Sequence, residues 1–572
     1  VLESLMTTFP CFCVQLLLIL PSISPFGSLV GACFLFRKKG VRGLWARLES
    51  RSLFGRCGCC TTPMAWRWLI SMIRKPFGIA KQNSFITEAD ACNPEAGPTM
   101  SKKKKSVAWP ALMALIFYEV SGGPFGVEDA VGQAGPILAV GGFLVLPFVW
   151  SIPEALVCAE LATMFPEDCG YVIWVTAAFG PYMGFLEGML SWTSGVADNV
   201  LYPALFLEYL KPLIPVLHNS FLRGVATLML SLMLTNFAYL GLDIVGTTSV
   251  GLMVFTMLPF GLLVFMGIPQ IMPELWFEGF QWEELVNNSD VHWNTYLNTL
   301  FWNLNYFDSV SCLAGEVEDP GNTFPRAMAA AFVVILSGYL LPLIVGTGIC
   351  IPKTKGKCAS WTEWSDGYFT KVAGAVGGPL LVYWVLVSAA LSNVGQFLAE
   401  MSSDAFQLLG MSERGFLPKA FARRSRFGTP PLGIAFSATG ICFGAFQKFD
   451  SIVELLNLLY CMAALLEFAA FLYLRWRHPC WPRPYRVPLP LWGCCLLLLP
   501  TVLMTIVIIV LAGWRQKVTL LAVVLGSCIL WPLLRLMKHN EWMEFNEDRF
   551  YSLPQDPEET MLLVPGTVWR ED

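Results

Sequence analysis

Residues 117–129 read Phe117-Tyr-Glu-Val-Ser-Gly-Gly-Pro-Phe-Gly-Val-Glu-Asp129, and they interrupt an apolar run that extends from 107 to about 131. The run is long enough to span a bilayer. A straight helix disfavours its middle, because glycine costs about 1 kcal/mol and proline about 3 kcal/mol in a helix interior. Carboxyl groups at Glu119, Glu128 and Asp129 flank the break. A broken helix beside acidic residues indicates a solute site in a secondary transporter. The alternative is a kink where two helices pack.

The composition predicts an all-α polytopic membrane protein. Of the 572 residues, 55% are hydrophobic and only 14% are charged, whereas soluble proteins average about 25% charged residues. We therefore expect a lipid bilayer and no nucleic acid as a partner; the net charge of −4 is small and does not indicate partners. We predict 12 transmembrane helices. They are expected at 107–131, 137–162, 172–208, 222–241, 246–267, 297–315, 327–350, 373–402, 431–447, 451–474, 490–512 and 518–537.

The two ends of the chain differ from its middle. We expect residues 1–106 to be an extension that is disordered or stems from an over-extended gene model. The reason is that Met100-Ser-Lys-Lys-Lys-Lys105 is typical of a cytosolic start before a first span. Residues 107–538 form the predicted transporter domain, and the acidic tail 539–572 is expected in the cytosol.

Positive charge predicts the orientation of the spans. Basic residues gather before the first span, at 414–426 and at 475–486, and these places share one side if there are twelve spans. Both termini are then cytosolic. Four lysines between 353 and 371 lie on the opposite side and weaken the bias.

A second break is expected in the sixth span, where Asn303, Asn305 and Asp308 lie at mid-membrane depth. Intramembrane acids usually face a cavity and carry function. We expect the backbone to unwind around Asn305 and Tyr306. Broken first and sixth helices, five spans apart, are typical of two inverted five-helix repeats. The repeats are predicted at 107–267 and 297–474, with two extra helices at 490–538.

Other polar residues inside the spans are further candidates. Asp198 and Tyr202 are four residues apart and therefore share one helix face. Glu467 either belongs to the site or pairs with Arg475 or Arg477 near the cytosolic end. Cys350 and Cys358 flank one outer loop, where they either pair or stay free. The weaker candidates are Ser388, Ser392, Asn393 and Tyr460.

The chain resembles the amino acid–polyamine–organocation transporter superfamily, and within it the plant polyamine-uptake (L-type amino acid transporter-like) branch. The resemblance covers 107–538 and leaves 1–106 unexplained. The residues that carry it are Ile116–Asp129, Trp150–Leu156 with Ala159–Ala162, Phe301–Ser309, Ala314–Pro320, Ala399–Leu409 and Arg483–Pro488.

This resemblance implies the inverted-repeat fold with two extra helices and proton-coupled symport of polyamines, with some members moving amino acids. No cofactor is implied. The residues that match the unwound first helix are Ser121, Gly122 and Gly123, and those that match the unwound sixth are Asn303, Asn305, Tyr306 and Asp308.

The charges favour a cationic solute. A polyamine needs carboxyl groups at intervals, which Glu119, Asp198 and Asp308 supply, with aromatic faces between them. An amino acid would instead need a carboxylate receptor, for which we consider free amides at 121–123 on a helix N-terminus. A buried acid can titrate near neutral pH, so Glu119 is our first candidate for proton coupling and Asp308 the second. Sodium coupling through Ser388 and Ser392 is the less favoured alternative.

Other functional classes remain open at this point. An enzyme is disfavoured because no Ser/His/Asp set, metal cluster or phosphate-binding loop is found in the sequence. An amino acid transporter of the same fold and a non-transporting receptor share the same sequence features. We expect the plasma membrane, with the ER, Golgi or vacuole as alternatives. The sequence does not define the oligomeric state.

Overall fold

The computed structural model describes residues 107–548, apart from 212–213, 278–290, 354–356, 445–446 and 448. The chain divides into two units, Val1–Lys102 and Lys103–Asp572, and every described residue belongs to the second. The predicted extension 1–106 and most of the predicted tail therefore lie outside the described residues.

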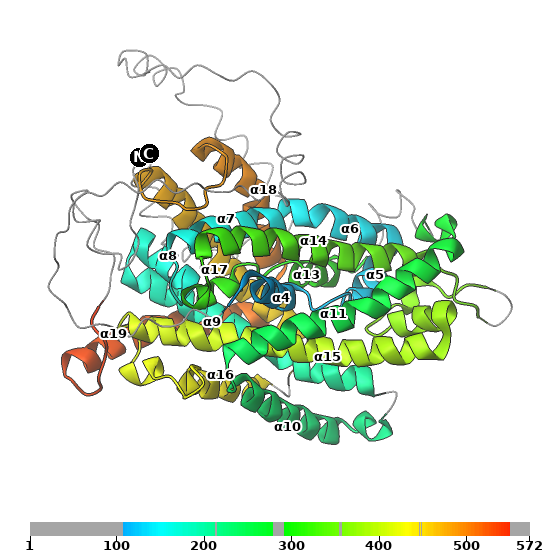
Figure 1. Cartoon of the computed structure of the whole chain (residues 1–572), viewed down its shortest axis with the longest axis horizontal. Helices are drawn as coiled ribbons and strands as arrows, with labels where there is room; N and C mark the ends of the chain where they lie inside the picture. Colours follow the sequence, from blue (N-terminus) through cyan, green and yellow to red (C-terminus); the bar gives the residue numbers. More distant parts are fainter. Residues whose placement is uncertain are drawn as a thin grey trace, which may run out of the picture. The chain divides into compact units, whose positions relative to one another are not determined.

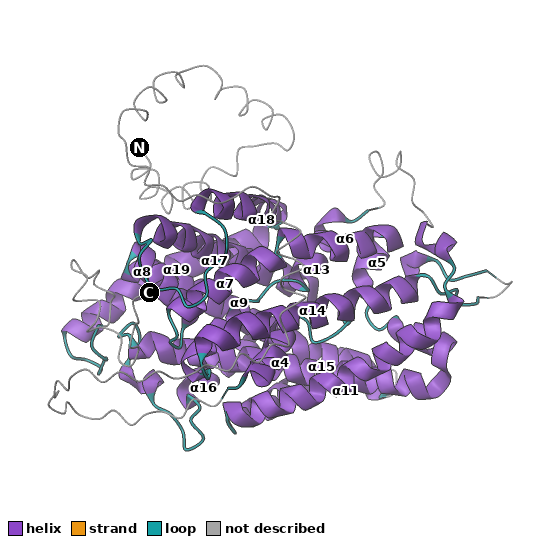
Figure 2. Cartoon of the chain, turned by 45° about the horizontal axis from the view of Figure 1, so that its top comes forward, coloured by secondary structure: helices purple, strands orange, loops and turns teal. Residues whose placement is uncertain are grey.

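The described residues form helices joined by loops, with no strand (Figure 2). Eight of these helices, or pairs of them, are long and apolar enough to cross a membrane. The α-helices are α4 (Trp109–Val120), α5 (Glu128–Ala134), α6 (Pro136–Val149), α7 (Ser151–Met164), α8 (Gly170–Phe179), α9 (Pro181–Leu210), α10 (Ser220–Ala238), α11 (Leu242–Gly267), α13 (Trp293–Trp302), α14 (Pro320–Thr347), α15 (Phe369–Glu413), α16 (Pro431–Gly444), α17 (Phe449–Arg477), α18 (Leu491–Leu511) and α19 (Trp514–His539).

The first predicted break is confirmed. Helix α4 ends at Val120 and α5 begins at Glu128. Between them Gly122 and Gly123 adopt φ values of 63° and 121°, which glycine reaches without a Cβ clash. The apolar run is thus divided by its own glycines.

The second predicted break is also confirmed. Helix α13 ends at Trp302, and the chain resumes as a 3₁₀-helix, η6 (Ser309–Glu316). Tyr306 lies between them with φ of 69°. A non-glycine residue in the left-handed region is strained, and such residues cluster at functional sites. The unwinding therefore falls where Asn305 and Tyr306 predicted it.

Three predicted spans have different bounds in the structure. The expected third span, 172–208, is wrong, because Gly180 with φ of 90° and the following Pro181 separate α8 from α9. The second span consists of α6 and α7, which meet at Trp150. The eighth extends to Glu413 within α15 and is kinked at Gly378, directly before Pro379. A proline lies at or shortly after each of these changes of direction, since Pro153 follows Trp150 by three residues. Proline has no backbone donor, so each change of direction has a local cause.

Helices distant in sequence enclose the two breaks. Helix α4 packs against α11, α14 and α15, and it lies among them in Figure 1. Helix α9 packs against α15, α17 and α8. On another side of the bundle Cys350 and Cys358 form a disulfide, as one of the two sequence interpretations expected.

Candidate functional site

A polar stripe follows one face of α9. Its members recur every three, four or seven residues, which places them on one side of the helix. All of these side chains are buried. The α9 stripe consists of Glu187, Ser191, Ser194, Asp198, Tyr202 and Tyr209.

Asp198 lies in the middle of the stripe and binds two aromatic side chains. Tyr202, one turn further along α9, donates its hydroxyl to Oδ2. The indole Nε1 of Trp302 donates to Oδ1 at 2.8 Å. The sequence paired Asp198 with Tyr202, and the structure brings them together. Trp302 was missed as a site residue, although it belongs to the quoted segment 301–309.

Glu119 lies at the end of α4 beside a group of acids from α15. Ser403 donates its hydroxyl to Glu119 Oε1, and the carboxyl of Glu400 lies beside Glu119, in electrostatic range. Asp404 follows one turn after Glu400, and both face Gly195 of α9. We call Glu119, Glu400 and Asp404 the Glu119 cluster.

A second acidic group surrounds the break in the sixth span. The Tyr460 hydroxyl lies 2.7 Å from Asp308 Oδ1 and 2.7 Å from Glu154 Oε1. The backbone N–H of Phe307 also donates to Glu154, at 2.6 Å. Glu467 of α17 lies beside Asp308, with the two carboxyl groups in electrostatic range. We call Asp308, Glu154, Tyr460 and Glu467 the Asp308 cluster.

The Asp308 cluster decides between the two interpretations of Glu467. That residue contacts Asp308 and, towards α9, Glu187. Arg475 instead binds Glu160. Among the described residues no ion pair joins Glu467 to Arg475 or to Arg477, so the alternative in which Glu467 pairs with either arginine is wrong. Glu154 and Glu187 were missed, since nothing local to either residue indicates its distant partner.

The two asparagines of the sixth span hold the broken segments. Asn303 Nδ2 donates to the carbonyl of Gly126 at 3.3 Å and to that of Thr299 at 2.8 Å, and Tyr339 donates to Asn303 Oδ1 at 3.1 Å. Asn303 thus ties one break to the other. Asn305 Nδ2 lies 3.5 Å from Asn457 Oδ1.

Tyr306 connects the break to the α9 stripe. Its hydroxyl lies 2.7 Å from that of Ser194, and its ring lies 4.5 Å from the ring of Tyr460, centroid to centroid. Its left-handed backbone directs this side chain towards α9, so the strained residue joins the stripe to the Asp308 cluster.

The amides at 121–123 are not free, which corrects one expectation. The N–H groups of Ser121 and Gly122 both donate to the carbonyl of Phe117, at 2.9 Å each. The N–H of Gly123 donates to Ser121 Oγ at 3.1 Å. These residues follow the C-terminal end of α4 rather than an N-terminus, and helix C-termini favour cations. In this conformation the segment offers no amide to a substrate carboxylate.

The two proposed sodium ligands differ, since the Ser388 hydroxyl has no hydrogen-bond partner among the described residues, whereas Ser392 is hydrogen-bonded to the first break. Ser392 donates its hydroxyl to the carbonyl of Gly122, and Gln396 Nε2 approaches the carbonyl of Ser121 at 3.4 Å. Helix α15 therefore supports the broken segment from behind through hydrogen bonds. These contacts give Ser392 a role in shaping the break.

The acids greatly outnumber the bases. Among the described residues, the buried bases are Arg414 and Arg475. Glu119 lies within electrostatic range of both Asp198 and Asp308. A buried carboxylate without a base partner is stable only when it is protonated or when a cation lies beside it. The site is therefore built to hold positive charge.

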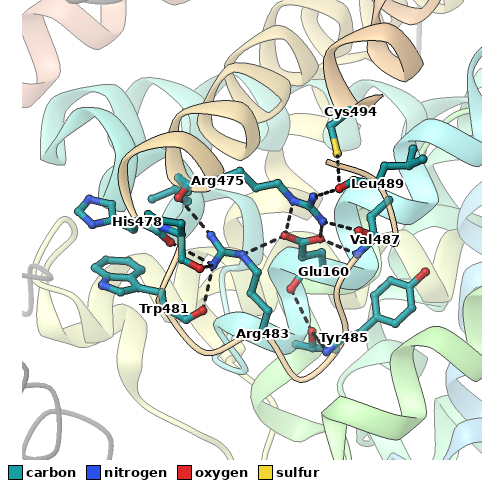
Figure 3. Close-up of polar contacts among 12 residues, drawn as sticks. Glu160, Arg475, His478, Trp481, Arg483, Tyr485, Val487, Leu489 and Cys494 are labelled. Atoms are coloured by element: carbon teal, nitrogen blue, oxygen red, sulfur yellow. Dashed lines mark hydrogen bonds and ion pairs between the residues drawn. The ribbon is translucent and has the colours of Figure 1, made fainter. Parts of the chain in front are cut away.

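A separate ion-pair cluster joins α7, α17 and the loop after α17 (Figure 3). Arg475 Nε donates to Glu160 Oε1 at 2.8 Å, and Arg483 Nε donates to the same oxygen at 3.0 Å. The N–H of Val487 binds the other oxygen at 2.8 Å. This carboxylate has its donors in place, so we assign it to holding the helices together.

Comparison with known proteins identifies the family. A model of the amino acid permease family matches residues 108–529. The chain belongs to this family. The matched part of this permease contains the α9 stripe and both acidic clusters. It is therefore a polytopic membrane permease and not an enzyme.

Three relatives of this permease cover most of its length. Polyamine transporter PUT1 of Oryza sativa subsp. japonica is 48% identical over 452 residues, which are 79% of this chain and 82% of the relative. Polyamine transporter RMV1 of Arabidopsis thaliana is 47% identical over 448 residues, 78% of this chain and 89% of the relative. A probable polyamine transporter of Arabidopsis thaliana is 47% identical over 469 residues, which are 82% of this chain and 94% of the relative.

Proposed function

We propose that this permease is a secondary active transporter that carries polyamines such as putrescine, spermidine and spermine into the cell by proton-coupled symport. The observation that carries the proposal is the group of Glu119, Asp198 and Asp308, which lie together with no buried base among them. The relatives named polyamine transporters support the substrate class.

Three features suit a flexible chain of ammonium groups. The carboxyl groups come from three separate segments, since Glu119 lies at the end of α4, Asp198 in α9 and Asp308 directly before η6. Tyr202 and Trp302 bind Asp198, and the ring of Tyr306 packs against Tyr460 of the Asp308 cluster. Aromatic rings therefore adjoin these carboxyl groups, where they can contact cations and methylene groups. The segment 121–123 presents a helix C-terminus, which favours an ammonium group over a carboxylate. Together these features favour a polyamine over a neutral amino acid.

The Asp308 cluster supports proton coupling. One hydroxyl hydrogen cannot satisfy two carboxylates, and Tyr460 lies 2.7 Å from an oxygen of both Asp308 and Glu154. A second proton on one of the acids resolves this contact. Asp308 thus becomes the stronger candidate for coupling, with Glu119 as the alternative.

The proposal includes the arrangement of the membrane spans. We infer twelve spans, in which the regions 107–267 and 297–474 are inverted repeats and 490–538 adds two helices. The breaks after α4 and after α13 occupy matching places in the two repeats and support this arrangement. Alternating access would then move the repeats around a fixed site. We expect cytosolic termini and the plasma membrane.

The test is uptake into proteoliposomes that contain the full chain. Radiolabelled spermidine and leucine are offered with and without an inward proton gradient. Spermidine uptake that the gradient stimulates supports the proposal. Leucine uptake alone would favour the amino acid transporter, and flux of neither would favour a receptor.

A further inference from the structure

A third group of acids lies away from the two clusters described above, where α5 meets the segment before α15. Glu128 begins α5 and is 0% exposed. Neither of its carboxyl oxygens has a hydrogen-bond partner of ordinary geometry among the described residues. An ionised carboxylate in this position is costly unless a cation lies beside it.

Two further polar atoms without such a partner belong to the same place. They are Oδ1 of Asp366 and the hydroxyl of Tyr209, and both are buried. Tyr209 lies within electrostatic range of Glu128 and of Asp366. A carbon added at Gly367 would lie 3.7 Å from the Tyr209 ring. Polar atoms from three separate elements therefore converge on one buried point.

The surrounding charges are also acidic. Asp129 interacts with the backbone amide of Asp366, and Asp450 at the start of α17 repels both of these acids. One basic side chain lies beside this group, since Lys371 Nζ is 4.6 Å from the centre of the Tyr368 ring. Other basic side chains pair with different acids. Lys211 and Arg223 pair with Glu208, and Lys353 pairs with Glu363.

Aromatic side chains surround Glu128, Asp366 and the Tyr209 hydroxyl. The rings of Phe125 and Tyr209 meet edge to face at 5.6 Å. Tyr368 and Trp364 stack at 4.4 Å beside Asp366. A carbon added at Gly132 would collide with the carbonyl of Trp364, so α5 lies directly against this segment. Acids beside aromatic faces suit an alkylammonium group.

This group is distinct from the central site but connected to it. Tyr209 follows Asp198 by three turns of α9, about 16 Å along the helix. The indole of Trp302 connects the two groups. It donates to Asp198 of the central site and would lie 2.9 Å from a carbon added at Gly126, close to Glu128. Gly126 directly precedes the segment that leads to Glu128.

We propose that Glu128, Asp366 and the Tyr209 hydroxyl form a second, outer binding site for an alkylammonium group, which an incoming polyamine occupies before it reaches Asp198. The inference rests on the proposed function for the identity of the substrate. In the conformation described here the packing of α5 against Trp364 closes the site, so entry requires these two segments to separate.

The test uses a probe too large to be transported, spermidine joined at one end to a bulky sulfonated dye. Its binding to the purified full chain is followed by fluorescence anisotropy. The Glu128→Gln variant is expected to weaken binding about ten-fold, the loss of one charge-assisted contact. Asp198→Asn should leave binding of the probe within two-fold of wild type. Glu274→Gln, which removes an exposed carboxylate of the 3₁₀-helix Pro273–Phe277, is the control.

The same variants are then compared in spermidine uptake. Glu128→Gln should raise KM about ten-fold and leave kcat within two-fold, whereas Asp198→Asn should lower kcat. Probe binding to Glu128→Gln that equals wild type overturns the outer site. If Glu128→Gln does not fold, Asp366→Asn decides, and binding unchanged in that variant overturns the site as well. Absence of spermidine uptake by wild type would overturn the proposed function, while loss of probe binding in Glu128→Gln would still support the outer site.

Discussion

The hydroxyl oxygen of Tyr460 lies 2.7 Å from Oδ1 of Asp308 and accepts a further bond from the backbone N–H of Tyr306 at 3.3 Å. Glu154 approaches the same hydroxyl from α7. Residues from three separate segments thus share one proton site, at the point where the sixth span is unwound. Movement of that segment would change the distances within the group, which gives the proton a direct connection to the conformation.

Replacement of Tyr460 by phenylalanine should uncouple transport from protons. The ring is kept, but the oxygen between Asp308 and Glu154 is lost. We expect the stimulation of spermidine uptake by an inward proton gradient to fall about ten-fold or more, while exchange without a gradient persists. Tyr473→Phe is the control, because Tyr473 lies on the same helix and packs against Phe179. Full stimulation in Tyr460→Phe would contradict the assignment.

The Asp308→Asn variant separates the two substrate classes. An amide cannot neutralise an ammonium group, so spermidine uptake should fall by about ten-fold or more. Uptake of any neutral amino acid that the wild type carries should fall less. The measurement is kcat/KM for both substrates in the same proteoliposomes. Equal losses would show that Asp308 does not bind the ammonium group.

Gly195 allows α9 to approach the Glu119 cluster. A carbon added there would overlap Asp404 Oδ1 and Glu400 Oε1, and would lie 3.2 Å from Asp404 Cγ. Gly195→Ala should therefore displace both acids, lower the free energy of unfolding by about 1–3 kcal/mol and reduce uptake.

Gly251→Ala is the matched control for Gly195→Ala, since a carbon added at Gly251 meets nothing within 4 Å. That variant should be neutral or stabilise α11 by up to about 1 kcal/mol. Thermal unfolding in detergent and spermidine uptake measure both effects. A Gly195→Ala variant as stable and active as Gly251→Ala would contradict the close approach.

Glu160→Gln should destabilise the protein more than loss of an exposed ion pair. The change leaves Arg475, which is 6% exposed, without its carboxylate partner, and a buried charge left unpaired costs about 3–5 kcal/mol. Glu208→Gln removes the half-exposed partner of Lys211 and Arg223 and should cost about 1 kcal/mol or less. Thermal unfolding compares the two variants. Similar losses would remove the structural role given to Glu160.

Asp366 provides a pH-dependent test outside the membrane spans. Burial, followed by repulsion from Asp129, Asp450 and Glu208, raises the pKa of Asp366 to about 8. In the unfolded chain an aspartate carboxyl titrates near pH 4. Between about pH 4 and pH 8 the unfolded state has therefore lost a proton that the folded state keeps. The contribution of Asp366 to the free energy of unfolding falls as the pH rises through this window.

The Asp366→Asn variant removes this dependence. Its Tm should match wild type near pH 4 and exceed it by about 2–4 °C at pH 8. Because an ammonium ligand favours the ionised carboxyl, added spermidine should raise the Tm of wild type more than that of the variant. A Tm difference that does not change with pH would contradict the raised pKa.

The sequence by itself determined the features that depend on neighbouring residues. Gly122, Gly123 and Pro124 break the first helix because their own backbone preferences oppose a helix. The length of each apolar run predicts where the chain can cross a bilayer. The shared face of Asp198 and Tyr202 follows from helical periodicity. These predictions needed no knowledge of distant contacts.

Only the tertiary structure decided how the buried charges are matched. Arg475 binds Glu160 rather than Glu467, Glu154 joins Asp308, and Glu128 faces Asp366. No local pattern predicts these pairs, because each joins segments more than a hundred residues apart. The amides at 121–123 likewise became donors to Phe117 and Ser121 only once the broken backbone took its shape. Inside a membrane protein a carboxyl group depends on the few partners that folding brings within reach, so its role is decided by the tertiary structure.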